Sequence, residues 1–261
     1  MNKGGLGFIL AGFLACNGMA ADLSAEQVRE QLTQSSEQKP ADFSKKDLSN
    51  LDLSGLDFKK ANLVKANLFG AKLVGSNLSG ANLSGVNLDA AWLMRANFSK
   101  ANLTNASLFG PVIYPSLDIN PAERPDFSGV NFAGARIIAR FSQLNLSGAN
   151  FAGARLGVDL KNQPMGQMRN DFSSADLAGA DFSGADVNRA LFAFANLAGA
   201  NFKGANLFRA DLSSADLTGA DLTGADLTET NLDGAILKNA KGLDQVKGWE
   251  KAVNRDKAIM N

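Results

Sequence analysis

A leucine or phenylalanine recurs at every fifth position over most of this chain. One uninterrupted series runs from Phe43 to Leu108, and a second runs from Phe172 to Leu237 with Val187 as its only other residue type. A small residue, usually Ala, stands two positions before most of these centres, and Asp or Asn stands one position before. The repeating unit is therefore A-[D/N]-[L/F]-x-x.

A period of five fits neither an ordinary helix nor an ordinary strand. Every fifth residue steps about 140° around an α-helix, so the centres would form no stripe. In a strand, whose side chains alternate, every second centre would point to the wrong face. The chain must turn a corner once in every unit so that each centre points inward, which predicts a solenoid built from an internal repeat.

The units resemble those of the pentapeptide-repeat family, as in ADLSSADLTGADLTGADLTETNLDGA over residues 210–235. Each of the two series contains fourteen centres, and seven more stand between them: Phe127, Phe132, Ile137, Phe141, Leu146, Phe151 and Leu156. The resemblance implies an all-β fold, a right-handed quadrilateral β-helix with four pentapeptides per lap and with the centre and the small residue inside. These units then predict about nine laps, or roughly 40 Å of stacked coil.

The residue before the centre alternates between Asp and Asn every twenty positions in the second series, as in Asp181, Asn201 and Asp221. Laps stacked about 4.8 Å apart would bring an unbroken column of Asp into mutual repulsion. An Asn layer between two Asp layers relieves that repulsion and can donate hydrogen bonds to both sides. The alternative is that Asp and Asn are interchangeable turn formers.

Residues 1–20 have the pattern of an export signal. Lys3 is followed by an apolar stretch that ends at Cys16, and small residues precede a cleavage site after Ala20. The stretch is too short to span a bilayer, for which about 20 residues are needed. A soluble periplasmic or secreted protein is therefore expected. One alternative is a lipoprotein anchored at Cys16, the only cysteine, and another is an uncleaved cytoplasmic protein.

Segments 21–40 and 240–261 flank the repeats, and each predicts a short helical cap. Ser24 and Gln27 have the spacing of a capping box, and apolar residues in 243–258 have roughly helical spacing. Caps cover the open core and the unpaired edge of a terminal lap. An alternative is that the C-terminal helix joins two copies tail to tail as a homodimer.

Proline-bearing gaps interrupt the repeats. The expected division is a signal peptide (1–20), an N-terminal helical cap and linker (21–40), pentapeptide laps (41–110, 126–156 and 171–239), loop insertions (111–125, Pro-rich, and 157–170) and a C-terminal helical cap (240–261). The repeat also slips by one residue between Ile137 and Phe141. Long loops on a rigid scaffold often carry function. The alternative is that they are tolerated insertions in a solenoid.

Candidate chemistry is sparse. The chain has no histidine, the commonest general base and metal ligand, and it contains no phosphate loop or nucleophile elbow. Its many Asp and Ser residues occupy repeat positions, so their frequency follows from the fold. We therefore expect no catalytic residue, no metal and no cofactor.

Function is expected where the repeat is broken. Several large apolar residues, Phe69 among them, stand in or near outward positions that otherwise carry small or polar residues. The candidate partner-binding residues are Trp92, Phe109, Tyr114, Leu191, Phe194 and Phe208. Exposed aromatic residues on a rigid surface favour a protein-binding patch. The alternative is that loops or terminal segments cover them.

The sequence thus favours an exported, non-enzymatic scaffold that binds an unknown protein partner through a solenoid face or its insertions. Nucleic acid is not an expected partner, and a membrane is one only if Cys16 is lipidated. The resemblance implies a second possibility, because some pentapeptide-repeat proteins mimic duplex DNA and bind DNA gyrase. Residues 171–237 carry ten acidic side chains against three basic ones, whereas 41–110 carry eight basic against five acidic. An enzyme is the third and least favoured class.

Overall fold

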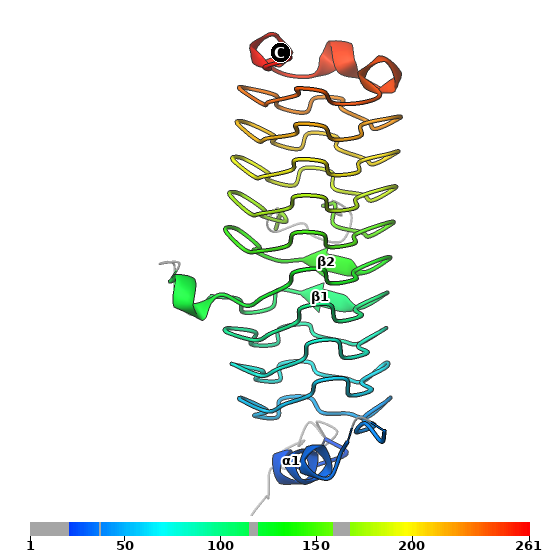
Figure 1. Ribbon diagram of the computed structural model, residues 1–261, viewed down its shortest axis with the longest axis vertical. Helices are drawn as coiled ribbons and strands as arrows, with labels where there is room; N and C mark the ends of the chain where they lie inside the picture. The colour runs from blue at the N-terminus through cyan, green and yellow to red at the C-terminus, as the bar shows by residue number, and fades with distance from the viewer. Residues whose placement is uncertain (1–20, 37, 115–119, 159–167) are drawn as a thin grey trace, which may run out of the picture.

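The computed structural model describes residues 21–36, 38–114, 120–158 and 168–261. The chain forms a column of stacked laps with α1 (Ala25–Thr33) at one end and the C-terminal residues at the other (Figure 1). The expected export signal, with Cys16, lies outside the described residues. No helix in the described part is long and apolar enough to cross a membrane.

Parallel bridges join residues one lap apart. Asp42 pairs with Asn62, 20 residues further along, and Asn62 pairs with Asn82 in the same way. Four columns of such bridges run along the coil, and we call them faces A, B, C and D after their first members Asp42, Asp47, Asp52 and Asp57. One lap therefore holds four pentapeptides. The predicted solenoid is confirmed, and within the described residues face A passes through ten laps.

The sides of the laps are too short for extended strands. In the described part of the chain, regular strands occur only at β1 (Ser107–Phe109) and β2 (Arg136–Ile138), which pair in parallel with Phe109 opposite Ile138. The other sides make single bridges. Each side is a two- or three-residue stretch between corners, which is the geometry that a five-residue period requires.

The corners are tight turns. In one example, the N–H of Ala66 donates to the carbonyl oxygen of Leu63 at 3.0 Å, and Lys65 between them has a φ of 57°. A positive φ at the third of four residues is the requirement of a type II turn, and glycine meets it without a steric cost. This requirement explains why glycine so often ends the repeating unit.

The centres fill the interior, and phenylalanines stack along it. Phe151, Phe182 and Phe202 form a stack on face A with ring centroids 4.8 and 4.9 Å apart. Phe172 and Phe192 stack on face C at 5.0 Å. Edge contacts join the two stacks, as between Phe182 and Phe192 at 5.7 Å. Each such pair contributes about 0.5–1.5 kcal/mol beyond area burial, so the middle laps have a stiff core.

The N-terminal cap is helical as predicted. The hydroxyl of Ser24 accepts from the N–H of Gln27 at 3.2 Å, and the side chain of Gln27 accepts from the N–H of Ser24 at 2.7 Å. Val28 is fully buried and belongs to the same core as the laps. The helix α1 therefore closes the first lap with an apolar side chain.

The prediction of a helical cap at 240–261 is wrong, because this segment forms one more lap of the coil. Its sides contain the 3-10 helices η2 (Leu243–Gln245), η3 (Trp249–Lys251) and η4 (Arg255–Lys257). Its bridged residues stand six apart: Lys241, Lys247, Val253 and Ile259. Left-handed backbone at Gly242, Gly248 and Asn254 prevents a continuous α-helix. A homodimer through a C-terminal α-helix therefore has no structural basis in this fold.

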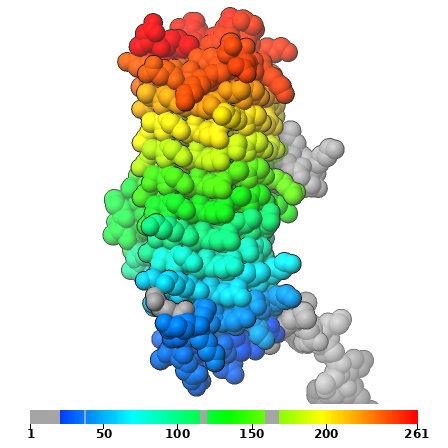
Figure 2. Space-filling view, turned by 45° about the vertical axis from the view of Figure 1, so that its right-hand side comes forward, coloured from blue at the N-terminus to red at the C-terminus, as the bar shows by residue number. Residues whose placement is uncertain are grey.

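The two insertions leave the coil on either side of face C. The first lies between faces C and D, so that Asn97 pairs with Asp126, 29 residues further along. It contains η1 (Pro121–Glu123), which stands out from an otherwise even column (Figures 1 and 2). The second insertion lies between faces B and C, so that Arg140 pairs with Asp171. Between them one lap has 19 residues, which confirms the predicted slip.

Candidate interaction surface

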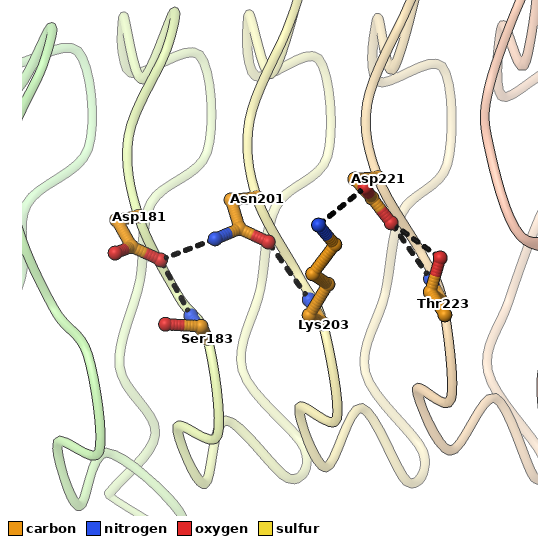
Figure 3. A network of polar contacts seen from close by, with 6 residues as sticks. All are labelled: Asp181, Ser183, Asn201, Lys203, Asp221 and Thr223. Carbon is orange, nitrogen blue, oxygen red and sulfur yellow. Dashed lines mark hydrogen bonds and ion pairs between the residues drawn. The ribbon is translucent and has the colours of Figure 1, made fainter.

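A ladder of Asp and Asn side chains runs along the faces. The Nδ2 of Asn201 donates to the Oδ1 of Asp181 at 2.9 Å, and the same oxygen accepts from the N–H of Ser183 (Figure 3). The Oδ1 of Asn201 accepts from the N–H of Lys203 at 3.1 Å. In this ladder the Asn amide donates to the preceding lap, and not to both sides as expected, while its oxygen accepts from its own turn.

Cations neutralise part of the outward negative charge. The Nζ of Lys203 lies 3.1 Å from Asp221 (Figure 3), and the Nε of Arg209 lies 2.7 Å from Glu229. A hydrogen bond from the hydroxyl of Thr223, 2.6 Å away, holds the pKa of the Asp221 carboxyl below its usual 3.8, and the charge of Lys203 adds to this effect. Within the described ranges, no group of three or more acidic, histidine or cysteine side chains could hold a metal.

Two of the six residues predicted to contact a partner are strongly exposed. Phe194 is 67% exposed and Trp92 is 41% exposed. Phe109, Leu191 and Phe208 are partly buried. These five residues lie on four laps of faces B and C, with Leu191 and Phe194 on the same lap, so they do not form one compact cluster.

The sixth predicted residue, Tyr114, is buried. Its hydroxyl donates to the carbonyl oxygen of Ser142 on the next lap, and the guanidinium of Arg140 lies 5.5 Å from its ring centre. Burial raises the pKa of the phenol to about 12. Tyr114 therefore attaches the start of the first insertion to the coil, and it is not available as a partner contact.

Phe109 belongs to an apolar column at the corner between faces B and C. Ile138 stands opposite it in the β1–β2 pair, and Phe69 occupies the same position two laps earlier with 46% exposure. Asp89 stands between Phe69 and Phe109 and accepts from the N–H of Phe109 at 2.8 Å. Apolar side chains thus collect along this corner at the level of the first insertion.

A groove of about 240 Å³ opens at the same corner. Its lining includes Gly110, Pro111, Ile138, Ala139, Arg140 and Met168. Met168, which is 46% exposed, comes from the second insertion and lies over Gly110. Trp92 stands one lap away, paired with Val112. The sequence predicts Trp92 as a partner contact. The groove depends on how the insertion packs against the coil, and no sequence pattern predicts it. We call Trp92, Pro111, Ile138 and Met168 the corner surface.

A second, polar groove of about 280 Å³ lies at the corner between faces C and D. Arg124, Asp126, Gln143 and Asp176 contribute to its lining, and Arg124 donates to the side-chain oxygen of Gln143 at 2.5 Å. Because this groove carries both signs of charge, it does not favour an acidic or a basic ligand. The corner surface is the better candidate for a protein contact.

The fold is a repeat solenoid, and its surface departs from the regular pattern where the two insertions leave the coil. The family described as Pentapeptide repeats (8 copies) matches residues 41–68, 61–99, 71–110, 171–207 and 205–241. These matches span more than half of the chain, so the protein belongs to the pentapeptide-repeat family. None of the curated proteins compared with this chain matches it.

Several solved structures are similar. HetL, a pentapeptide repeat protein involved in heterocyst differentiation regulation from the cyanobacterium Nostoc sp., is 27% identical, with 91% of this chain and 94% of HetL covered at a TM-score of 0.38. Trypsin-treated QnrB1, a plasmid-mediated fluoroquinolone resistance protein, is 16% identical, with coverages of 82% and 88% and a TM-score of 0.45. A pentapeptide repeat protein from the Arabidopsis thaliana thylakoid lumen is 32% identical, with coverages of 44% and 65% and a TM-score of 0.26.

Proposed function

We propose that this chain is an exported, non-enzymatic pentapeptide-repeat scaffold that binds a protein partner through the corner surface. The observation that carries the proposal is the apolar groove, flanked by the exposed side chains of Trp92 and Met168, on a coil whose outward positions are mostly small or polar. Exposed apolar area of this kind on a rigid scaffold favours protein contacts.

The non-enzymatic part of the proposal is supported by the roles of the polar side chains. Asp and Asn before each centre cap their own turn and bond along the ladder, as Asp181 and Asn201 do. Such groups are fixed by the coil, and Asp126 and Asp176, which both line the polar groove, stand two laps apart on face D. A general acid and base need a shared site near a substrate, and the ladder separates its carboxylates by whole laps.

The export part of the proposal is supported by the sequence pattern of residues 1–20. Mass spectrometry of the mature N-terminus tests it directly. A chain that begins at Ala21 supports soluble export to the periplasm or medium, and a lipid-modified Cys16 supports an anchored lipoprotein. An intact Met1 would contradict both forms of export.

A capture experiment tests the contact surface. Tagged protein is crosslinked in an extracytoplasmic fraction, and recovered partners are compared between wild type, a Trp92→Ser/Met168→Ser variant and a Phe194→Ser control. We expect the double variant to lose the partner and the control to keep it, because Phe194 lies away from the corner surface. Equal recovery from all three proteins, with unchanged circular dichroism, would reject this surface.

A DNA-mimicking function is the competing candidate, because carboxylates occur on all four faces of residues 171–237 at alternate laps. The Asn layers and the cations Lys203 and Arg209 reduce the negative charge of that surface. Inhibition of gyrase supercoiling by the mature chain at micromolar concentration would favour this candidate. Absence of inhibition would leave the scaffold proposal.

A further inference from the structure

The laps between the two insertions are rich in arginine. Residues 127–158 contain no Asp and no Glu, but they contain Arg136, Arg140 and Arg155. The acidic residues nearest to this segment in the position before the centre are Asp126 and Asp171. The segment therefore forms a local positive band at the level of the corner surface.

Two of these arginines stand directly opposite each other. Arg136 pairs with Arg155 on face B, and both side chains are exposed. In the other laps the same position of face B carries Asp, Asn or Ser, except for Lys247 in the last lap. Neighbouring strands lie about 4.8 Å apart, and like charges directly opposite each other are destabilising. The coil thus places two arginines opposite each other on neighbouring laps, at a cost to its own stability.

Nothing in the described part of the chain neutralises this pair by contact. Both arginines make backbone hydrogen bonds, as the N–H of Arg136 does with Ala106, but the guanidinium groups of Arg136 and Arg155 have no hydrogen bond or ion pair among the described residues. Asp186 follows Arg155 on face B, but its Oδ1 is used by Asn188 and Asn206, each at 2.9 Å. The positive charge of the pair is therefore free for an external anion.

Arg140 has a different role. Its Nε lies 3.3 Å from the hydroxyl of Ser142 and 3.9 Å from Asp171, and its guanidinium lies over the ring of Tyr114. These contacts hold Arg140 at the edge of the groove. The unpaired arginines of the band are thus Arg136 and Arg155.

The arginine pair lies beside the apolar groove. Arg136 and Ile138 belong to β2 and stand on the same side of the strand, about 7 Å apart at the rise of a strand, and Arg136 is exposed whereas Ile138 is only 7% exposed. Ile138 lines the groove. An extended peptide also separates residues two positions apart by about 7 Å and points them to the same side. Such a peptide could place a carboxylate at the arginines and an apolar side chain in the groove.

We propose that Arg136, Arg155 and the groove recognise an extended acidic segment of the partner protein, with Asp or Glu two residues from an apolar side chain. This inference rests on the proposed function and gives the chemistry of its partner. Carboxylates form short, charge-assisted and often bidentate hydrogen bonds with arginine. A protein segment is favoured over nucleic acid because the groove is apolar and because the Asp186 carboxylate would meet a longer polyanion.

A direct binding measurement tests this inference without the natural partner. The probe is a fluorescein-labelled serine peptide that contains glutamate and leucine separated by one serine, and binding is followed by anisotropy at low salt. We expect the Arg136→Gln/Arg155→Gln variant to weaken binding at least tenfold and Arg209→Gln, which is on a distant lap, to leave it unchanged. Peptides with lysine for glutamate, or serine for leucine, should bind at least tenfold more weakly to the wild type.

Stability separates a binding role from a structural one. Because the double variant removes the repulsion between two adjacent cations, its melting temperature should equal or exceed that of the wild type. A lower melting temperature would mean that the arginines serve the fold, and it would overturn the inference. Failure of the peptide to bind at millimolar concentration, or preference for a single-stranded DNA oligomer of equal charge, would overturn it as well.

The capture experiment distinguishes the two proposals. If the Arg136→Gln/Arg155→Gln variant recovers the same partner as the wild type, the scaffold function stands and the acidic-segment inference fails. If no partner is recovered by the wild type although the peptide binds in an arginine-dependent way, the proposed scaffold function fails while the anion preference of the site remains.

Discussion

The side-chain amide of Asn170 donates a hydrogen bond to the carbonyl oxygen of Ile137 at 2.8 Å within the core. The same amide donates to the carbonyl oxygen of Leu156 at 2.6 Å, and its oxygen accepts from the N–H of Ala139 at 2.9 Å. Asn170 stands where most units carry Ala. It therefore supplies hydrogen bonds where the shortened lap and the second insertion disturb the regular bridges.

Replacing Asn170 by Ala should lower the free energy of unfolding by about 2–4 kcal/mol, because buried backbone groups lose their partners. Urea unfolding followed by circular dichroism measures this loss. Asn196→Ala is the matched control, since Asn196 is exposed and bonds to Asp176 at the surface, and it should cost about 1 kcal/mol or less. Equal losses from the two variants would show that Asn170 has no special role.

The phenol of Tyr114 should titrate with a pKa of about 12 in the folded protein, above its ordinary 10.0, because burial disfavours the phenolate. Since the folded pKa is the raised one, its contribution to stability is complete below pH 10 and is lost as the pH rises toward 12. Tyr114 is the only tyrosine, so absorbance near 295 nm reports it alone. A midpoint near 10 while the protein remains folded would contradict the buried placement.

Substitution of Gly248 by Ala should destabilise the last lap. Its φ is 69°, and a Cβ at this position would lie 2.7 Å from the Cα of Thr228. Gly199→Ala is the control, because Gly199 has a similar φ of 67° but open space around it. We expect Gly199→Ala to cost about 1 kcal/mol from the backbone alone and Gly248→Ala to cost more. Thermal unfolding of the two variants measures the difference, and equal melting temperatures would contradict the close contact.

Removal of the Thr223 hydroxyl should raise the pKa of the Asp221 carboxyl toward 3.8, because that hydroxyl donates to the carboxylate at 2.6 Å. Because the folded pKa is depressed, the carboxylate stabilises the fold above pH 3.8, and this contribution disappears as the pH falls through the folded value. Carboxyl NMR titration of Thr223→Val measures the change. Thr218→Val, on another face, should leave the titration of Asp221 unaltered, and a shift of equal size there would count against the hydrogen bond.

The five-residue period predicts the coil because each centre imposes one corner, and the capping box at Ser24 and Gln27 is a local pattern that predicts α1. The C-terminal lap is misread for a physical reason. The bridged residues of this lap stand six apart, and apolar residues lie about halfway between them. Apolar residues therefore recur every three or four positions. The same spacings mark one face of an α-helix, and the sequence pattern does not separate the two structures.

The interaction surface depends on contacts that the period does not encode. A strict twenty-residue lap would place Arg136 opposite Leu156, an inward centre, whereas the shortened lap places it opposite Arg155. Tyr114 and Met168 owe their positions to the return paths of the insertions. The sequence shows where the repeat is interrupted, but the geometry at each interruption follows from tertiary packing.

The last lap shows how the coil tolerates a longer side. Its bridges join residues 20, 21, 22 and 23 positions apart in succession, from Asp221 with Lys241 to Ile236 with Ile259. Its sides are six residues long, yet all four of its corners stay paired with the five-residue lap before it. The extra residue is accommodated within each side, in η2, η3 and η4, so the corners and not the number of residues between them set the register of the stack.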